Sequence, residues 1–397
     1  MTPPAGSASR AAAAEVPARP VVGGDQPILG QPAALSLLRR SMERGRMHHA
    51  WIFHGPFGVG KCTAALRLAR LLLDPATDAA AMAAFAPPEG TETARLIDAG
   101  THPDLHVIRK EMAAQSDNRE LRERKQTNIP LDLLRERMLG GVDSQGTAHS
   151  AAVFRTAVLG HGKVFIIDEA ELLEAETQNA MLKTLEEPPP RTWIILCTSQ
   201  AERLLPTIRS RCQSVPFGTM SPEAMAAWWT RSGVQADGAA RAWIDDFAAG
   251  SPGMALLAVN HNLAAWHEAL EPQLDALRRG RGGPALAETM ATLVEEYAQS
   301  VVKENESASK EAANRAGVRL LTAAAGQWLR RMLRESLPKG AAAAETWTDL
   351  VDQLAHTEDA VRASLNMKHV FSNLVAQWQR RLDEARAAAA ASGRSPR

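Results

Sequence analysis

The stretch GPFGVGK, from Gly55 to Lys61, is the part of the sequence that decides the fold of the first half of the chain. It lies between a short apolar run at residues 50–53 and a helical pattern at residues 63–73. A glycine-rich turn between a strand and a helix lets backbone N–H groups surround phosphate oxygens, while the lysine and the helix dipole add positive charge. The stretch therefore predicts a phosphate-binding loop. Its expected contact residues are Gly55, Gly58, Gly60 and Lys61.

Two further apolar runs, at residues 164–167 and 193–197, alternate with helical patterns. Strands that are apolar along their whole length, with helices between them, are typical of a parallel sheet covered on both faces. Residues 78–92 are rich in Ala and Pro and residues 115–126 are charged, so we expect surface insertions or long loops in both segments. Residues 28–217 are therefore predicted to form an α/β domain.

The sequence after residue 217 lacks strand patterns. Ser221, Pro222 and Glu223 form a good helix start, because they supply an N-cap, a proline in the first helical position and an acid near the positive end of the dipole. Helical patterns then continue to about residue 386 and are interrupted only at residues 250–253 and 278–284. This part of the chain is predicted to be all-α.

The composition narrows the class of protein. The chain has 397 residues with a formal net charge of zero, which argues against binding nucleic acid by charge alone. Its three cysteines stand far apart, so they indicate neither a disulfide framework nor a cysteine zinc site. No apolar stretch is long enough to span a membrane, and the Ala/Pro-rich start lacks the continuous apolar core of a signal peptide. We expect a cytoplasmic protein of two or three domains.

One position of the phosphate-binding loop departs from the motif. The residue after the lysine should be Ser or Thr, whose hydroxyl binds magnesium, but here it is Cys62. A thiol is a soft and poor ligand for this hard ion. Thr63 does not replace the hydroxyl, because one helical step turns its side chain by roughly 100°. We therefore expect that the site could bind nucleotide but would turn over Mg-ATP poorly.

An acidic pair, Asp168 and Glu169, ends the apolar run at residues 164–167. An aspartate at the carboxyl end of a strand can hold magnesium through water, and the neighbouring glutamate can orient the attacking water. An acidic loop after a strand is common for other reasons, but the phosphate-binding loop upstream favours the functional interpretation.

Two later segments carry a specific resemblance. They are TQNAMLKTLEEPP at residues 177–189 and LLPTIRSRC at residues 204–212. With the loop and the acidic pair, they resemble bacterial DNA polymerase III clamp-loader subunits of the AAA+ family. Residues 28–31 and 46–51 also resemble the family's opening segment. The resemblance covers about residues 28–217.

The resemblance implies an α/β AAA+ domain with a RecA-like parallel sheet, followed by a small helical lid and an all-α collar domain. The expected division of the chain is a disordered tail at 1–26, an AAA+ P-loop domain at 27–218, a helical lid at 219–258, a helical collar for oligomerisation at 259–386 and a disordered tail at 387–397.

The resemblance also implies roles for single residues. Arg211 of the Ser-Arg-Cys motif matches the arginine finger that projects into a neighbouring subunit's ATP site. Thr198 falls at the first sensor position, near the γ-phosphate. The second sensor of the family is an arginine in a G-S-x-R pattern, whereas residues 250–253 of this chain read GSPG. That arginine is missing, which agrees with Cys62 in indicating weak ATP hydrolysis.

These departures are similar to the family's delta-prime type, in which the ATP site is often degenerate and Ser-Arg-Cys is kept. An active ATPase motor subunit of the gamma/tau type stays an alternative, as does an AAA+ regulator or helicase loader with unrelated partners. The chain would be a component of a DNA-directed DNA polymerase (nucleotidyltransferase) holoenzyme without polymerase activity of its own and with weak or absent ATPase activity.

The implied partners are the gamma/tau and delta subunits, the sliding clamp and, through the complex, primer-template DNA. Motor subunits carry a four-cysteine zinc module after the phosphate-binding loop, but residues 73–102 of this chain contain no cysteine. His102 and His106 lack further ligands, and a structural zinc site needs four. We therefore expect no zinc and interpret both histidines as ordinary surface residues.

Overall fold

The computed structural model describes residues 28–43, 47–236, 238–305, 308–362 and 366–391. The tail expected at residues 1–26 lies outside the described residues.

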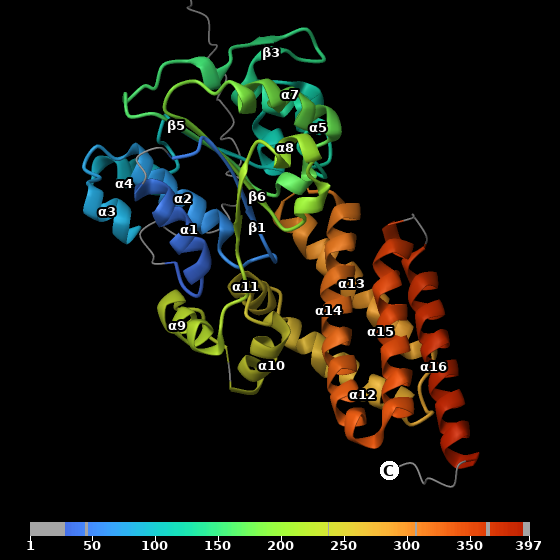
Figure 1. Ribbon diagram of the computed structural model, residues 1–397. Coiled ribbons are helices and arrows are strands. Elements are labelled where there is room, and N and C mark those ends of the chain that lie inside the picture. The colour runs from blue at the N-terminus through green and yellow to red at the C-terminus, as the bar shows by residue number, and fades with distance from the viewer. Residues whose placement is uncertain (1–27, 44–46, 237, 306–307, 363–365, 392–397) are drawn as a thin grey trace, which may run out of the picture.

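A five-stranded sheet forms the centre of the first half, and its strands run parallel in the order β2-β5-β6-β1-β7 (Figure 1). The strands are β1 Ala50–His54, β2 Leu105–Ile108, β5 Lys163–Ile167, β6 Thr192–Thr198 and β7 Gln213–Pro216. The three strands predicted from apolar runs are confirmed as β1, β5 and β6. Strand β2 and strand β7, which border the sheet, were not singled out by the sequence pattern.

Helices cover both faces of this sheet, because successive side chains of each strand point to opposite faces. Trp51 and Phe53 pack with helices α1 (Pro32–Glu43) and α2 (Lys61–Leu73) on one face. Ala50 and Ile52 pack on the other face with α6 (Leu131–Leu134) and α7 (Ala175–Glu186). The predicted RecA-like α/β architecture is confirmed.

The two segments expected to be surface insertions or long loops contain short helices, α3 Ala79–Ala84 and α5 Arg119–Glu123, and α4 Glu92–Asp98 follows the first segment. Each begins after a capping side chain that accepts a hydrogen bond from the first turn: Asp78, Thr91 and Asn118. Such caps stabilise the first turn of a short helix, and the residue composition of a segment does not reveal them.

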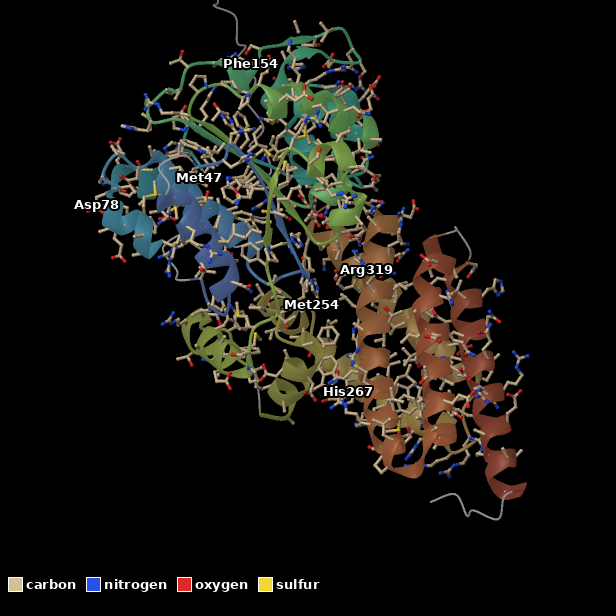
Figure 2. The ribbon with its side chains drawn as sticks, viewed as in Figure 1. Met47, Asp78, Phe154, Met254, His267 and Arg319 are labelled. Carbon is tan, nitrogen blue, oxygen red and sulfur yellow. The ribbon has the colours of Figure 1, made fainter. Side chains whose placement is uncertain are left out.

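The connections between the strands hold several smaller elements. They are the 3₁₀ helices η1 Lys110–Gln115, η3 Ala152–Phe154, η4 Ala170–Leu172 and η5 Ala201–Arg203, the π-helix η2 Arg135–Leu139, the antiparallel strands β3 Gly141–Val142 and β4 Ala148–His149, and helix α8 Pro206–Arg209. Phe154 lies at the end of the molecule farthest from the C-terminal helices (Figure 2).

The described chain after β7 is helical, as predicted. Its helices are α9 Pro222–Ser232, α10 Gly238–Ala248, α11 Pro252–Asn260, α12 Leu263–Arg278, α13 Pro284–Glu304, α14 Lys310–Ser336, η6 Leu337–Lys339, α15 Ala341–Arg362 and α16 Met367–Ala391. The predicted start is confirmed, because the Ser221 hydroxyl accepts a hydrogen bond from the Ala224 N–H and Pro222 occupies the first turn.

One hydrophobic cluster runs through these helices, from Met225 on α9 to Leu382 on α16. Trp328 and Trp378 both lie in this cluster, where they are 3% and 0% exposed, so they are core residues rather than surface anchors. Helices α13 to α16 form an elongated bundle beside the sheet (Figure 1).

Two of the expected boundaries fall inside helices. The division at residues 258/259 would cut α11, which runs from Pro252 to Asn260. Helix α16 continues to Ala391, past residue 386, where a disordered tail was expected. Alanine is the strongest helix former, and the Arg386 guanidinium donates a 2.8 Å hydrogen bond to the carbonyl oxygen of Arg278, which ties this end down. Residues 392–397 lie outside the described residues.

Candidate functional site

The phosphate-binding loop follows β1 and has a backbone that only glycine adopts readily. Gly55, Gly58 and Gly60 have φ values of 141°, 75° and 99°. A Cβ atom on Gly55 would lie 2.0 Å from the carbonyl oxygen of Phe217, so no side chain fits there. Gly60 immediately precedes α2, whose first turn points its N–H groups into the loop. The loop thus has the backbone form of an anion-binding nest.

Lys61 is buried and turns its ammonium group toward the loop itself. Its Nζ donates hydrogen bonds of 2.7 Å to the carbonyl oxygen of Gly55 and 2.6 Å to that of Pro56. Burial lowers the pKa of Lys61, and the nearby Cys197 and Glu171 oppose that effect. An incoming phosphate would therefore compete with these two carbonyl oxygens for the lysine.

An arginine that the sequence analysis did not single out lies across the site. Strand β2 pairs with β5 so that Ile108 lies opposite Ile167, and the next residues, Arg109 and Asp168, are therefore neighbours at the carboxyl edge of the sheet. Arg109 Nε lies 3.6 Å from Asp168 Oδ2, and Arg109 Nη2 lies 3.8 Å from Cys62 Sγ. The guanidinium group connects the two positions where the motif expects ligands of magnesium.

The charge of Arg109 is secured by these neighbours. Burial on its own would lower the pKa of Arg109, but the adjacent Cys62 and Asp168 outweigh it, so the pKa is raised. The sequence does contain a signal for this residue, because Arg109 directly follows β2. Strand β2 pairs with β5, the strand that ends at the acidic pair. Only the pairing of β2 with β5 makes that signal readable.

These residues do not fit a magnesium ion. Mg²⁺ takes oxygen ligands in a tight octahedral shell. Here the residue after the lysine offers sulfur, and a fixed positive charge lies between that sulfur and Asp168. Thr63 is the third residue of α2, one helical step beyond Cys62, and so faces a different direction.

Glu169, the second acid of the pair, is bound within the chain. Its backbone has a φ of 55°, which is unusual for a residue other than glycine. Its carboxylate forms an ion pair with Lys110, which also lies 3.5 Å from Glu111. To orient a water molecule, Glu169 would first have to leave this lysine.

Thr198 is the last residue of β6 and lies opposite His54 of β1. It is 1% exposed, and its hydroxyl oxygen accepts a 3.0 Å hydrogen bond from the backbone N–H of Gln200. The carboxyl edge of the sheet therefore brings together the loop, Asp168 and Thr198.

The segment at residues 250–253 packs directly on the phosphate-binding loop. The Ser251 hydroxyl donates a 2.7 Å hydrogen bond to the carbonyl oxygen of Phe57, and the Gly253 N–H donates a 2.9 Å hydrogen bond to that of Gly58. A Cβ atom on Gly253 would lie 2.5 Å from the Cα atom of Gly58. Position 253, where the resemblance would place an arginine, thus has no room for a side chain. Met254 follows at the start of α11, below the sheet (Figure 2).

Arg211 lies at the other edge of the sheet. It precedes β7, whose Gln213 pairs with Trp51, whereas the phosphate-binding loop follows the last residue of β1, His54. A five-residue strand separates these edges by roughly 16 Å, which is farther than an arginine side chain extends. The guanidinium is partly exposed, pairs with Glu186 at the end of α7 and donates a 2.9 Å hydrogen bond to the carbonyl oxygen of Thr207.

The interpretation of His102 and His106 as surface residues was wrong. His102 is 5% exposed, and its Nδ1 accepts a hydrogen bond from the backbone N–H of Asp104. The ring of His106 stacks on Phe165 with 4.5 Å between centroids. Both therefore have structural contacts. Among the described residues, no group of three or more His, Cys, Asp or Glu is placed to hold a metal ion.

Fold and site together define an AAA+ subunit built on a phosphate-binding loop. Residues 30–221 match a family model described as DNA polymerase III, delta subunit. The chain is 32% identical over 197 residues to DNA polymerase III subunit delta' of Bacillus subtilis, covering 49% of this chain and 50% of that protein. It is 32% identical to subunit delta' of Escherichia coli, covering 54% and 56%.

A third relative, subunit gamma/tau of Mycobacterium tuberculosis, is 30% identical, with 60% of this chain and 36% of that protein covered. Over residues 30–221 the chain is therefore similar to the clamp-loader subunits of DNA polymerase III, the delta' subunits among them. It spans about half the length of the delta' relatives that it matches. Within the described residues, no helix is both long and apolar enough to cross a membrane.

Proposed function

We propose that this chain is a non-motor subunit, of the delta-prime type, in a DNA polymerase III clamp loader. It assembles with gamma/tau motor subunits and a delta subunit through its C-terminal helices, and the complex places a sliding clamp on primer-template DNA. The match of residues 30–221 to the family model and the names of the relatives support this proposal. The division into a P-loop domain, a lid and a collar stays part of the same proposal.

The observation that carries the proposal is the position of Arg211. It lies at the amino edge of the sheet, away from the chain's own phosphate-binding loop, and its side chain is partly exposed. A guanidinium group in this position is out of reach of the chain's own loop but is accessible to an ATP site of a neighbouring subunit. There it would stabilise the charge that develops on the γ-phosphate during hydrolysis. In the isolated chain the Arg211 side chain forms an ion pair with Glu186, which it would exchange for the phosphate of the neighbouring site.

The chain's own site supports a non-motor role. Arg109 lies between Cys62 and Asp168, Glu169 is paired with Lys110, and Gly253 leaves no room for a side chain. The intact acidic pair is the one feature that favours an active gamma/tau-like motor, and these contacts weigh against it. An unrelated AAA+ regulator is disfavoured by the match over residues 30–221.

The test is the DNA-stimulated rate of ATP hydrolysis by a loader reconstituted with this chain. Arg211→Ala is expected to lower the rate at least several-fold, because one motor site loses its arginine finger. Arg209→Ala removes an exposed arginine from the same segment and is the matched control, expected to leave the rate near that of the wild type. Gel filtration must show that both variants enter the complex. An unchanged rate with Arg211→Ala would refute the proposal.

A further inference from the structure

We propose that the phosphate-binding loop of this chain takes a nucleoside polyphosphate without a divalent cation, with Arg109 as the built-in counter-charge. The inference goes beyond the proposed function and does not depend on the arginine finger. It rests on three features of the site: the form of the loop, the position of Arg109 and the side of the loop to which the lid binds.

The loop already has the shape needed to bind phosphate. Gly58 and Gly60 hold the left-handed backbone conformations that turn successive N–H groups inward. Helix α2 begins at Lys61 without a side chain that caps its first turn. Its first N–H groups and the positive end of its dipole therefore face the loop, where an anion would satisfy them.

Arg109 supplies the charge that magnesium would otherwise bring. Its guanidinium lies between Cys62 and Asp168, and its Nε is buried without a hydrogen-bond partner, since the 3.6 Å separation from Asp168 is an ion pair only. Leaving a buried donor unsatisfied is costly, about 1–3 kcal/mol or more for a charged group. A phosphate oxygen in the loop would provide the missing acceptor.

The lid does not block the side of the loop that binds phosphate. Ser251 and Gly253 both donate to carbonyl oxygens of the loop, those of Phe57 and Gly58. Neither contact uses a loop N–H group. Binding requires only that the Lys61 ammonium exchange the carbonyl oxygens of Gly55 and Pro56 for phosphate oxygens.

A magnesium ion is expected to bind weakly in this site. Cys62 offers sulfur in place of a hydroxyl, and the fixed positive charge of Arg109 would repel Mg²⁺ next to Asp168. Without the ion, a bound triphosphate also lacks the group that draws charge from the γ-phosphate. The site would hold nucleotide as a structural ligand rather than hydrolyse it.

The test is a titration of the purified full chain with ADP and ATP by calorimetry, once with Mg²⁺ and once with EDTA. The wild type is expected to bind with dissociation constants that agree within about threefold between the two buffers. Arg109→Ala is expected to weaken binding in EDTA at least about tenfold, whereas Arg109→Lys, which keeps the charge, retains part of it. Arg119→Ala removes an exposed arginine of α5 and serves as the control for loss of charge.

Circular dichroism melting curves establish that each variant is folded. A double variant, Cys62→Thr with Arg109→Ala, restores the hydroxyl and removes the guanidinium, so its binding is expected to require Mg²⁺. The inference is overturned if the wild type binds no nucleotide, if its binding requires Mg²⁺, or if Arg109→Ala binds as well as the wild type in EDTA. None of these results would affect the role of Arg211, which the ATPase of the loader reports separately.

Discussion

Single residues determine which chemistry this site can perform. Gly253 stands where the family places an arginine, and its Cα packs against the backbone of Gly58. The absence of an arginine here is therefore more than the loss of one charge, because the backbone of Gly58 occupies the space that a side chain at position 253 would need. Restoring the arginine alone is not expected to restore the sensor.

Gly253→Arg is expected to destabilise the chain by about 1–3 kcal/mol, since the new side chain must push the lid off the loop. The φ of Gly253 is not in the left-handed region, so the cost comes from the contact with Gly58 rather than from backbone strain. Urea unfolding measures the change. Gly238→Ala, where no atom lies within 4 Å of the added Cβ, is the control. Equal stability of the two variants would contradict the close packing.

His106 makes stability depend on pH. Burial, the largest cause, lowers the pKa of His106 from the ordinary value of 6.5, and the nearby Lys163 adds to the effect. The unfolded chain then takes up a proton at a higher pH than the folded chain. The contribution to stability is therefore complete above about pH 7 and is lost as the pH falls below 6.5.

His106→Phe keeps a ring against Phe165 and removes the titration. We expect the fall in melting temperature between pH 7.5 and pH 5.5 to be smaller in this variant than in the wild type. His356→Gln, an exposed position on α15, should leave the fall unchanged. If the pH dependence of His106→Phe equals that of the wild type, another group causes it.

At the scale of elements, the contact between α11 and the phosphate-binding loop joins the two halves of the chain. Ser251 caps α11, because its hydroxyl oxygen accepts a hydrogen bond from the Met254 N–H, and it also donates to the carbonyl oxygen of Phe57. One side chain thus fixes both the start of a helix and the position of the loop.

Ser251→Ala is expected to cost about 1–2 kcal/mol and to speed hydrogen exchange in the loop at residues 55–61. Ser309→Ala removes a comparable cap from α14, where the hydroxyl accepts a hydrogen bond from the Ala312 N–H. It should cost a similar amount of stability without changing exchange in the loop. Mass spectrometry of exchanged amides distinguishes the two, and equal loop protection in both variants would contradict a coupling through Ser251.

The sequence was informative where an element carries its own signal. Strands β1, β5 and β6 are apolar runs, and Ser221 with Pro222 marks the start of α9, so all were predictable. Strands β2 and β7 have only four residues each and contain polar positions, and they exist because neighbours pair with them. For the same reason Arg109 could not be predicted as a site residue, because its position beside Asp168 follows from the β2–β5 register.

At the scale of the whole molecule, the phosphate-binding loop and Arg211 lie at opposite edges of one sheet. The phosphate-binding loop, Asp168 and Arg109 gather at the carboxyl edge, and Arg211 lies at the amino edge. This arrangement separates supplying an arginine from hydrolysing ATP, so a chain could lose the second ability and keep the first.

The most direct test of this account compares Lys61→Ala with Arg211→Ala in the same reconstituted loader, by the DNA-stimulated rate of ATP hydrolysis. We predict that Arg211→Ala slows hydrolysis at least several-fold and that Lys61→Ala leaves the rate close to that of the wild type, because the chain's own site contributes no turnover. Equal damage by Lys61→Ala would contradict the account and identify the chain as a motor subunit.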